Sequence, residues 1–132
     1  MRTLRTFASL SLILAFLLLA CRPPDSAARG ADAGVSVTVE LPDDPVVGPA
    51  PLTIRLERDG LAVRGAEVEV TGDMTHAGMV PVVARAEERA DGSYRADDFV
   101  FDMAGDWIVT VEARLEDGGR VLAEAATTVR RP

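Results

Sequence analysis

Two methionines and the only histidine of the chain lie within six consecutive positions, in a loop bounded by glycines. Met74, His76 and Met79 supply two thioether sulfurs and one imidazole nitrogen. Residues two apart project to the same side of an extended chain, and Gly78 allows a bend that returns Met79 to the other two. Soft donors of this kind suit Cu(I), which thioethers bind without losing a proton. The spacing therefore predicts a Cu(I) site at Met74, His76 and Met79, with Met103 as a fourth ligand or a lid.

A second interpretation of these residues needs no metal. Methionine commonly fills irregular gaps in hydrophobic cores, and a single loop histidine is usually just solvated. Met103 lies close to aromatic residues in the sequence and can simply pack on Trp107. The two interpretations differ in pH dependence, because a site that uses imidazole should weaken below about pH 6.5, where the ring takes up a proton.

Other chemistries lack the residues they need. One histidine cannot form a three-histidine zinc site, and a single cysteine provides neither a disulfide nor a thiolate cluster. No glycine-rich phosphate loop or nucleophile elbow is present. The adjacent acidic pairs, such as Asp43-Asp44, have side chains that diverge on a strand and are unsuited to acid–base catalysis. We therefore expect a protein that is not an enzyme.

The first residues have the pattern of an export signal. Arg2 and Arg5 precede an apolar run over residues 10–20, which is the charged segment and short hydrophobic segment of a signal peptide. We predict that residues 1–20 are this signal. An uncleaved anchor helix is the alternative, since residues 4–20 are close to the lower limit of about 17 for a membrane span.

The signal ends in Leu18-Leu19-Ala20-Cys21, which resembles the lipobox of bacterial lipoproteins. The resemblance implies cleavage before Cys21 and attachment of lipid to that cysteine. Because Arg22 rather than Asp follows, the outer membrane is favoured over the inner membrane. We expect a protein of the cell envelope that faces the periplasm or the extracellular side.

Charge limits the partners of the exported part. Without Arg2 and Arg5, twelve arginines face twenty-one acids, a net charge near −9. Such a surface repels phosphate backbones, so we expect no nucleic-acid binding. It also disfavours docking on anionic lipid by charge alone, which leaves the acyl chains at Cys21 to hold the membrane.

The remainder reads as a tether and one β domain. Residues 21–34 are small, polar and rich in Pro and Gly, as in flexible tethers, and residues 35–131 form the domain. Apolar and polar residues alternate in seven segments, as in half-buried strands: 35–41, 52–57, 66–71, 80–86, 93–101, 107–115 and 121–129. Turn signals between them predict an immunoglobulin-like antiparallel β-sandwich, with a small barrel as the alternative.

Strand direction predicts where the connections lie. If consecutive strands alternate in direction, the Asp-Gly turns at 59–60, 91–92 and 117–118 share one end. The Pro-rich connection, the Met74–Met79 loop and Met103 then share the other end, whereas Ser93 lies far from His76. The first strand would begin at the Asp-Gly end, so the histidine loop should point away from the lipid.

Several motifs carry a resemblance to a known family. Gly65-Ala66 before a strand, the methionine–histidine loop, Gly92-x-Tyr94 and Phe101-x-Met103-x-Gly105-x-Trp107 resemble the YtkA-like and FixH-like exported domains. The resemblance covers about residues 35–130. It implies an immunoglobulin-like sandwich, copper handling and a part in assembling haem–copper oxidases. FixH-type members usually have a membrane-spanning helix, whereas this chain has a lipobox.

These observations favour an envelope lipoprotein that binds Cu(I). It would act as a copper carrier or an accessory factor in oxidase assembly, with a haem–copper oxidase or a copper transporter as partner. The alternative is a metal-free interaction module whose loop end or sheet edge docks to an envelope protein complex.

Overall fold

The computed structural model describes residues 28–32, 34–76 and 78–132. The predicted signal peptide and Cys21 lie outside the described residues. Within them the chain is all β, with no helix long and apolar enough to cross a membrane.

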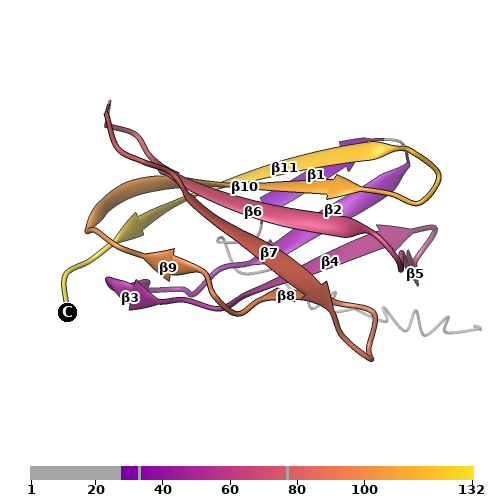
Figure 1. The fold of residues 1–132 in the computed structure, drawn as a ribbon, viewed down its shortest axis with the longest axis horizontal. Coiled ribbons are helices and arrows are strands. Elements are labelled where there is room, and N and C mark those ends of the chain that lie inside the picture. The colour runs from indigo at the N-terminus through magenta and orange to yellow at the C-terminus, as the bar shows by residue number, and fades with distance from the viewer. Residues whose placement is uncertain (1–27, 33, 77) are drawn as a thin grey trace, which may run out of the picture.

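Eight strands follow one another in a single antiparallel sheet that folds over on itself (Figure 1). One half contains β1 (Ala28–Asp32), β2 (Val35–Glu40), β4 (Leu52–Arg58) and β8 (Tyr94–Ala96). The other half contains β7 (Val82–Glu88), β6 (Glu67–Met74), β10 (Gly105–Arg114) and β11 (Arg120–Val129). The halves are joined where β7 pairs with β8, and β1 lies against β11 on the opposite side. The predicted all-β sandwich is confirmed.

Three short strands complete the fold. β5 (Leu61–Ala62) pairs with β4 directly after the Asp59-Gly60 turn. β3 (Gly48–Pro49) pairs with β9 (Val100–Phe101) as a separate two-stranded sheet. Residues 93–101, which we expected as one strand, are thus divided between β8 and β9. The division falls at Asp97-Asp98, where the chain turns.

The core is filled by the residues that alternation predicted. Val35, Val37 and Val39 of β2 are fully buried, while Ser36 and Glu40 between and after them are exposed. The largest buried side chains come from several strands and loops: Trp107, Tyr94, Phe99, Phe101, Leu52, Ile54 and Leu56. Apolar burial of this kind supplies about 25 cal/mol per Å² and is the main term that stabilises a domain without disulfides.

The connections divide between the two ends as predicted. Every pair of neighbouring strands in the large sheet is antiparallel, so the direction alternates along the chain. The Asp-Gly turns lie at one end of the molecule. The β6–β7 connection, β3, β9 and the start of β10 lie at the other end, on the left of Figure 1. We call this second end the loop end.

The expected position of the tether was wrong. β1 occupies residues 28–32, inside the segment where we expected no regular structure, and pairs with β2 so that Ala28 lies opposite Val39. The described chain therefore begins at the loop end, beside the last residues of β2, and not at the Asp-Gly end. The argument that the histidine loop points away from the lipid loses its basis. β1 escaped the sequence pattern because ARGAD has no apolar alternation, and its place is set by hydrogen bonding to β2.

Candidate functional site

Met74 is the last residue of β6 and lies at the edge of the core. It follows Val68, Val70 and Gly72 on the inward face of the strand, where alternate residues are buried. Its side chain is half-buried and packs against the core cluster. In the ladder between β6 and β10, Met74 lies opposite Trp107. Strand register therefore fixes this thioether next to the only tryptophan of the chain.

Gly105, the first residue of β10, leaves space for the end of the Met74 side chain. A Cβ atom added at Gly105 would lie 2.6 Å from Met74 Cε. The glycine also has a φ of +143°, a backbone conformation that other residues rarely adopt. Met74 thus packs directly over the backbone at the start of β10.

An aromatic cluster forms the floor beneath this methionine. The rings of Phe99 and Phe101 meet edge to face with centroids 5.2 Å apart, and those of Phe101 and Trp107 meet at 5.3 Å. Edge-to-face packing of this kind adds about 0.5–1.5 kcal/mol per pair beyond area burial. Trp107 is only 2% exposed. The loop end therefore has a rigid apolar base.

Met103 precedes Gly105 in the chain, and its main chain contacts the same tryptophan. Trp107 Nε1 donates a hydrogen bond of 3.0 Å to the carbonyl oxygen of Met103, while the Met103 side chain remains 45% exposed. The amide of Thr75 donates to the carbonyl oxygen of Asp106 at 3.1 Å. These contacts tie the end of β6 to the start of β10, and they tie the main chain of Met103 to the tryptophan that lies opposite Met74.

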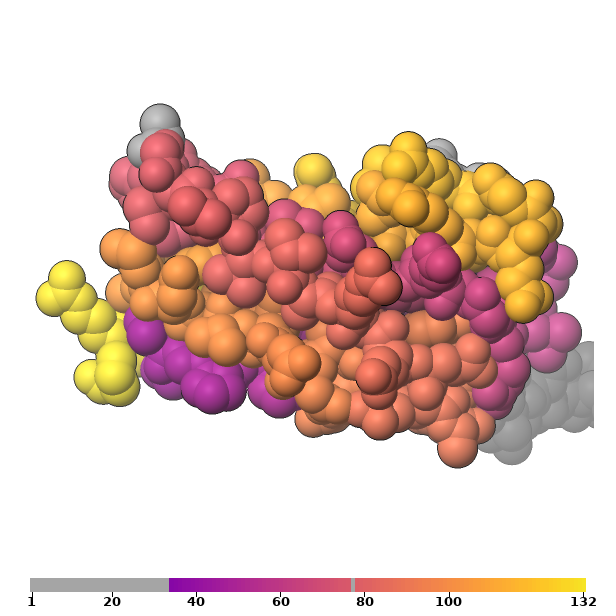
Figure 2. All heavy atoms as spheres, in the orientation of Figure 1, coloured from indigo at the N-terminus to yellow at the C-terminus, as the bar shows by residue number. Residues whose placement is uncertain are grey.

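His76 and Met79 lie on the β6–β7 connection, residues 75–81, which projects from the loop end in Figures 1 and 2. His76 is exposed and Met79 is half-buried. The next residues of the hairpin are apolar and open to solvent, with Val80 83% and Val83 58% exposed. All four predicted ligands thus belong to the loop end, but on two different supports. Their joint coordination of copper stays a prediction.

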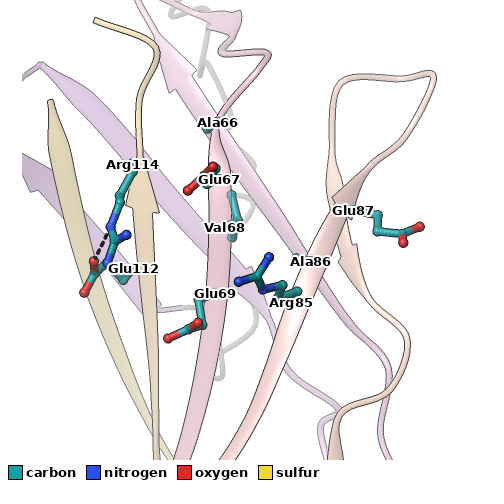
Figure 3. A pocket seen from close by; sticks show the side chains of 9 residues that line it. All are labelled: Ala66, Glu67, Val68, Glu69, Arg85, Ala86, Glu87, Glu112 and Arg114. Atoms are coloured by element: carbon teal, nitrogen blue, oxygen red, sulfur yellow. Dashed lines mark hydrogen bonds and ion pairs between the residues drawn. The ribbon is translucent and has the colours of Figure 1, made fainter. Parts of the chain in front are cut away.

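The outer face of β6, β7 and β10 carries charged side chains, some of which form ion pairs. Figure 3 shows a shallow hollow in which the Glu112 carboxylate is paired with Arg114. Glu112 also accepts from Arg120 at 2.7 Å, and these two arginines hold the pKa of Glu112 below its usual value, with Arg120 the larger cause. Within the part of the chain that the structure describes, no three His, Cys, Asp or Glu residues gather closely enough to hold a metal ion.

Ser93 belongs to the opposite end from His76, as its position in the sequence predicted. Its hydroxyl group donates to Asp91 Oδ1 at 2.6 Å, and its amide donates to the same oxygen at 3.0 Å. Both bonds lower the pKa of Asp91 below its usual value. This arrangement closes the turn at Asp91-Gly92 and leaves the serine remote from any histidine.

Sequence reasoning selected Met74, His76, Met79 and Met103 as ligands, which stays a prediction, and it did not identify the residues that surround them. Gly105 and Trp107 were recognised only as parts of a scaffold motif. Their part in placing Met74 and Met103 depends on the register between β6 and β10, which determines that Trp107 faces Met74. The Gly-x-Trp spacing, directly after Met103, was the signal available in the sequence.

Comparison with known proteins agrees with this architecture. The soluble domain of PmoD from Methylocystis sp. ATCC 49242 (Rockwell) has a TM-score of 0.51 at 16% sequence identity, over 80% of this chain and 98% of that chain. CopC from Methylosinus trichosporium OB3b has a TM-score of 0.49 at 15% identity, over 79% of this chain and 94% of that chain. At such identities the PmoD likeness shows a shared fold.

Sequence comparison then places the chain in a family. A search of curated proteins gives no match. The YtkA-like family model matches residues 30–112, which is more than half of the 132 residues. The match includes the methionine–histidine loop, the Gly-x-Tyr motif and the Met103–Trp107 segment. The chain belongs to the YtkA-like family.

Proposed function

We propose that this chain is a lipid-anchored envelope protein without enzymatic activity that binds Cu(I) at its loop end. It would carry copper, or assist the assembly of an oxidase, by receiving the ion from one envelope protein and passing it to another. Cys21 would hold the lipid, and the negative charge of the domain leaves anchoring to the acyl chains.

The observation that supports this proposal is that Trp107 contacts the main chain near two of the predicted ligands. Met74 lies opposite Trp107 in the β6–β10 ladder, and Trp107 Nε1 donates to the main-chain carbonyl oxygen of Met103. His76 and Met79 extend from the adjoining connection. A donor set of thioethers and one imidazole fits Cu(I) better than Zn²⁺ or Ca²⁺, which prefer thiolate, imidazole or oxygen ligands.

Partial exposure suits a carrier more than a permanent cofactor site. Met103 is 45% exposed and His76 is exposed, so a partner could approach the ion and exchange ligands with it. Neutral thioethers accept and release the ion without any proton transfer, and the buried aromatic floor keeps the base of the site rigid. Membership of the YtkA-like family supports the same role, because the family resemblance implies copper handling and oxidase assembly.

A Cu(I) titration against a colorimetric chelator tests the proposal. The wild-type protein should withdraw copper from the chelator, and the double variant Met74→Ala/His76→Ala should not. Ser36→Ala, on the outer face of β2, is a matched control that should behave as the wild type. Equal copper binding by the double variant would refute the assignment.

Anchoring is tested separately. Cys21→Ser should move the protein from the membrane fraction to the soluble fraction of cells, because the acyl chains would have no attachment site. A membrane-bound Cys21→Ser variant would instead support an uncleaved anchor helix.

A second function is favoured by the apolar surface of the β6–β7 hairpin. Val80 and Val83 are mostly exposed, and Ile108 on the neighbouring strand β10 is 39% exposed. A metal-free module could use these residues to dock to an envelope protein complex. Charge substitutions at Val80 and Val83 would then abolish the cellular function without changing copper affinity, whereas the methionine variants would have no effect.

A further inference from the structure

The predicted ligands lie on two segments of the chain, the β6–β10 region and the β6–β7 connection, and these segments differ in the number of contacts that hold their backbone. Met74 lies in the β6–β10 ladder, and the backbone of Met103 accepts the indole hydrogen bond of Trp107. The bond from the Thr75 amide to the Asp106 carbonyl continues the pairing of β6 with β10 just beyond Met74. His76 and Met79, by contrast, lie on the connection that projects away from the body of the sandwich (Figures 1 and 2).

This difference bears on metal affinity because a soft cation is held best by donors that need little ordering. Every side chain that must be immobilised on binding costs conformational entropy and so lowers the affinity. Met74 has already lost much of its freedom, since it is half-buried and its methyl group lies over Gly105, where a Cβ atom would approach it to 2.6 Å. The backbone of Met103 is held by the hydrogen bond from Trp107 Nε1, so that only its side chain would have to be ordered by the ion.

We propose, on the basis of the function above, that the primary ligands of the soft cation are Met74 and Met103, with Trp107 as the positioning residue. The ligand class is a monovalent soft cation, Cu(I) or Ag(I), held between two neutral sulfurs. Binding breaks the bonds of the ion to its previous ligands and forms two bonds to sulfur. No electron or proton is transferred, and the complex gains one positive charge.

Trp107 positions the pair through its backbone and through its indole N–H group. Pairing with Met74 in the ladder fixes one sulfur, and the hydrogen bond from Nε1 to the Met103 carbonyl fixes the backbone that carries the other. Gly105 stands between them and leaves the space that a side chain would fill. His76 and Met79 then serve as secondary donors, available for exchange with a partner protein.

Trp107 also provides the measurement. It is the only tryptophan in the chain, so its fluorescence reports on an ion bound beside it. Ag(I), which resembles Cu(I) and is not oxidised in air, would be titrated into the purified full-length protein. Competition for Cu(I) with a colorimetric chelator gives the affinity independently.

Leucine substitutions distinguish the Met74–Met103 pair from Met79, because leucine keeps the apolar character and approximate shape of methionine but has no sulfur. Met74→Leu and Met103→Leu should each lower affinity for Ag(I) and Cu(I) by about tenfold or more, a loss typical of disrupted metal sites, and should reduce the fluorescence response. Met79→Leu is the matched control and should stay within about threefold of the wild type. Urea unfolding of each variant shows whether the fold is kept, and a variant that unfolds early is replaced by the norleucine analogue of the same methionine.

The outcomes distinguish this inference from the function on which it rests. If Met79→Leu and His76→Ala abolish binding while Met103→Leu does not, copper binding stands and the Met74–Met103 pair is refuted. If the wild-type protein binds neither Ag(I) nor Cu(I), the proposed function itself fails. Loss of affinity in Met74→Leu and Met103→Leu alone supports the pair.

Discussion

Gly72 is the position where one added methyl group should disturb the base of the candidate site most directly. It lies on the inward face of β6, two residues before Met74, and is buried. A Cβ atom there would lie 2.6 Å from Phe99 Cζ, 3.1 Å from Phe99 Cε2 and 3.2 Å from Trp107 Cζ3. Since Phe99 is fully buried, its ring cannot move out into solvent.

The magnitude follows from two opposing effects. Forcing an extra methyl group into a packed core costs about 1–3 kcal/mol. Replacing glycine by alanine inside a strand recovers roughly 0.5–1 kcal/mol by restricting the unfolded chain. The φ of Gly72 is not in the left-handed region, so no backbone strain is added. Gly72→Ala should therefore lower the free energy of unfolding by about 1 kcal/mol, or roughly 4–8 °C in melting temperature.

Urea unfolding followed by Trp107 fluorescence measures this change. The slope with urea should match the wild type, and the midpoint should fall. Phe99→Leu removes the ring that the new methyl group meets, so the double variant Gly72→Ala/Phe99→Leu should be more stable than the sum of the two single losses implies. A Gly72→Ala protein as stable as the wild type would show that the aromatic rings can yield, which would refute the rigid floor proposed beneath Met74.

Two further predictions concern the Asp-Gly end of the sandwich. Tyr94→Phe should cost about 1–3 kcal/mol of unfolding free energy in urea, because the buried Tyr94 hydroxyl donates to the Val63 carbonyl at 2.8 Å; an unchanged midpoint would contradict this. Glu88 accepts from the Gly65 amide and pairs with Arg64, and these contacts lower the pKa of Glu88 below its ordinary 4.5. Its stabilising effect is present above about pH 4.5 and is lost as the pH falls through the lowered pKa. Melting temperatures should therefore favour wild type over Glu88→Gln at pH 7 and converge in acid, whereas a constant difference would point to another cause.

The six long strands could be predicted because burial on one face imposes alternation on the sequence. β2, for example, buries Val35, Val37 and Val39, whereas Ser36 is exposed and Thr38 is half-buried. The short strands β3, β5 and β9 contain two residues each, too few for any period to show. Their pairing is imposed by the longer strands and turns around them, so no local pattern could have revealed it.

The candidate site could be predicted only as a set of residue types. Methionine and histidine carry donor atoms that suit soft metals, so the residue types alone indicate this chemistry even when their positions in the fold are unknown. Whether Met74 meets Met103 depends on the β6–β10 register and on the indole hydrogen bond, which join residues about thirty positions apart. The sequence also failed to predict that the chain enters the sheet beside Val39. That position depends on the antiparallel pairing of β1 with β2, which no local pattern reveals.

The two ends of the sandwich differ in what fastens them, and this difference bears on function. Acidic side chains close the Asp-Gly end: Asp117 Oδ1 accepts from the Gly119 amide at 2.9 Å, and Glu88 holds Gly65. These carboxylates have lowered pKa values, so acid weakens that end first. The contacts that place Met74 and Met103 use backbone groups and an indole N–H, which do not titrate between pH 3 and 9. Acid should therefore loosen the Asp-Gly turns before it disturbs the main-chain contacts around Met74 and Met103.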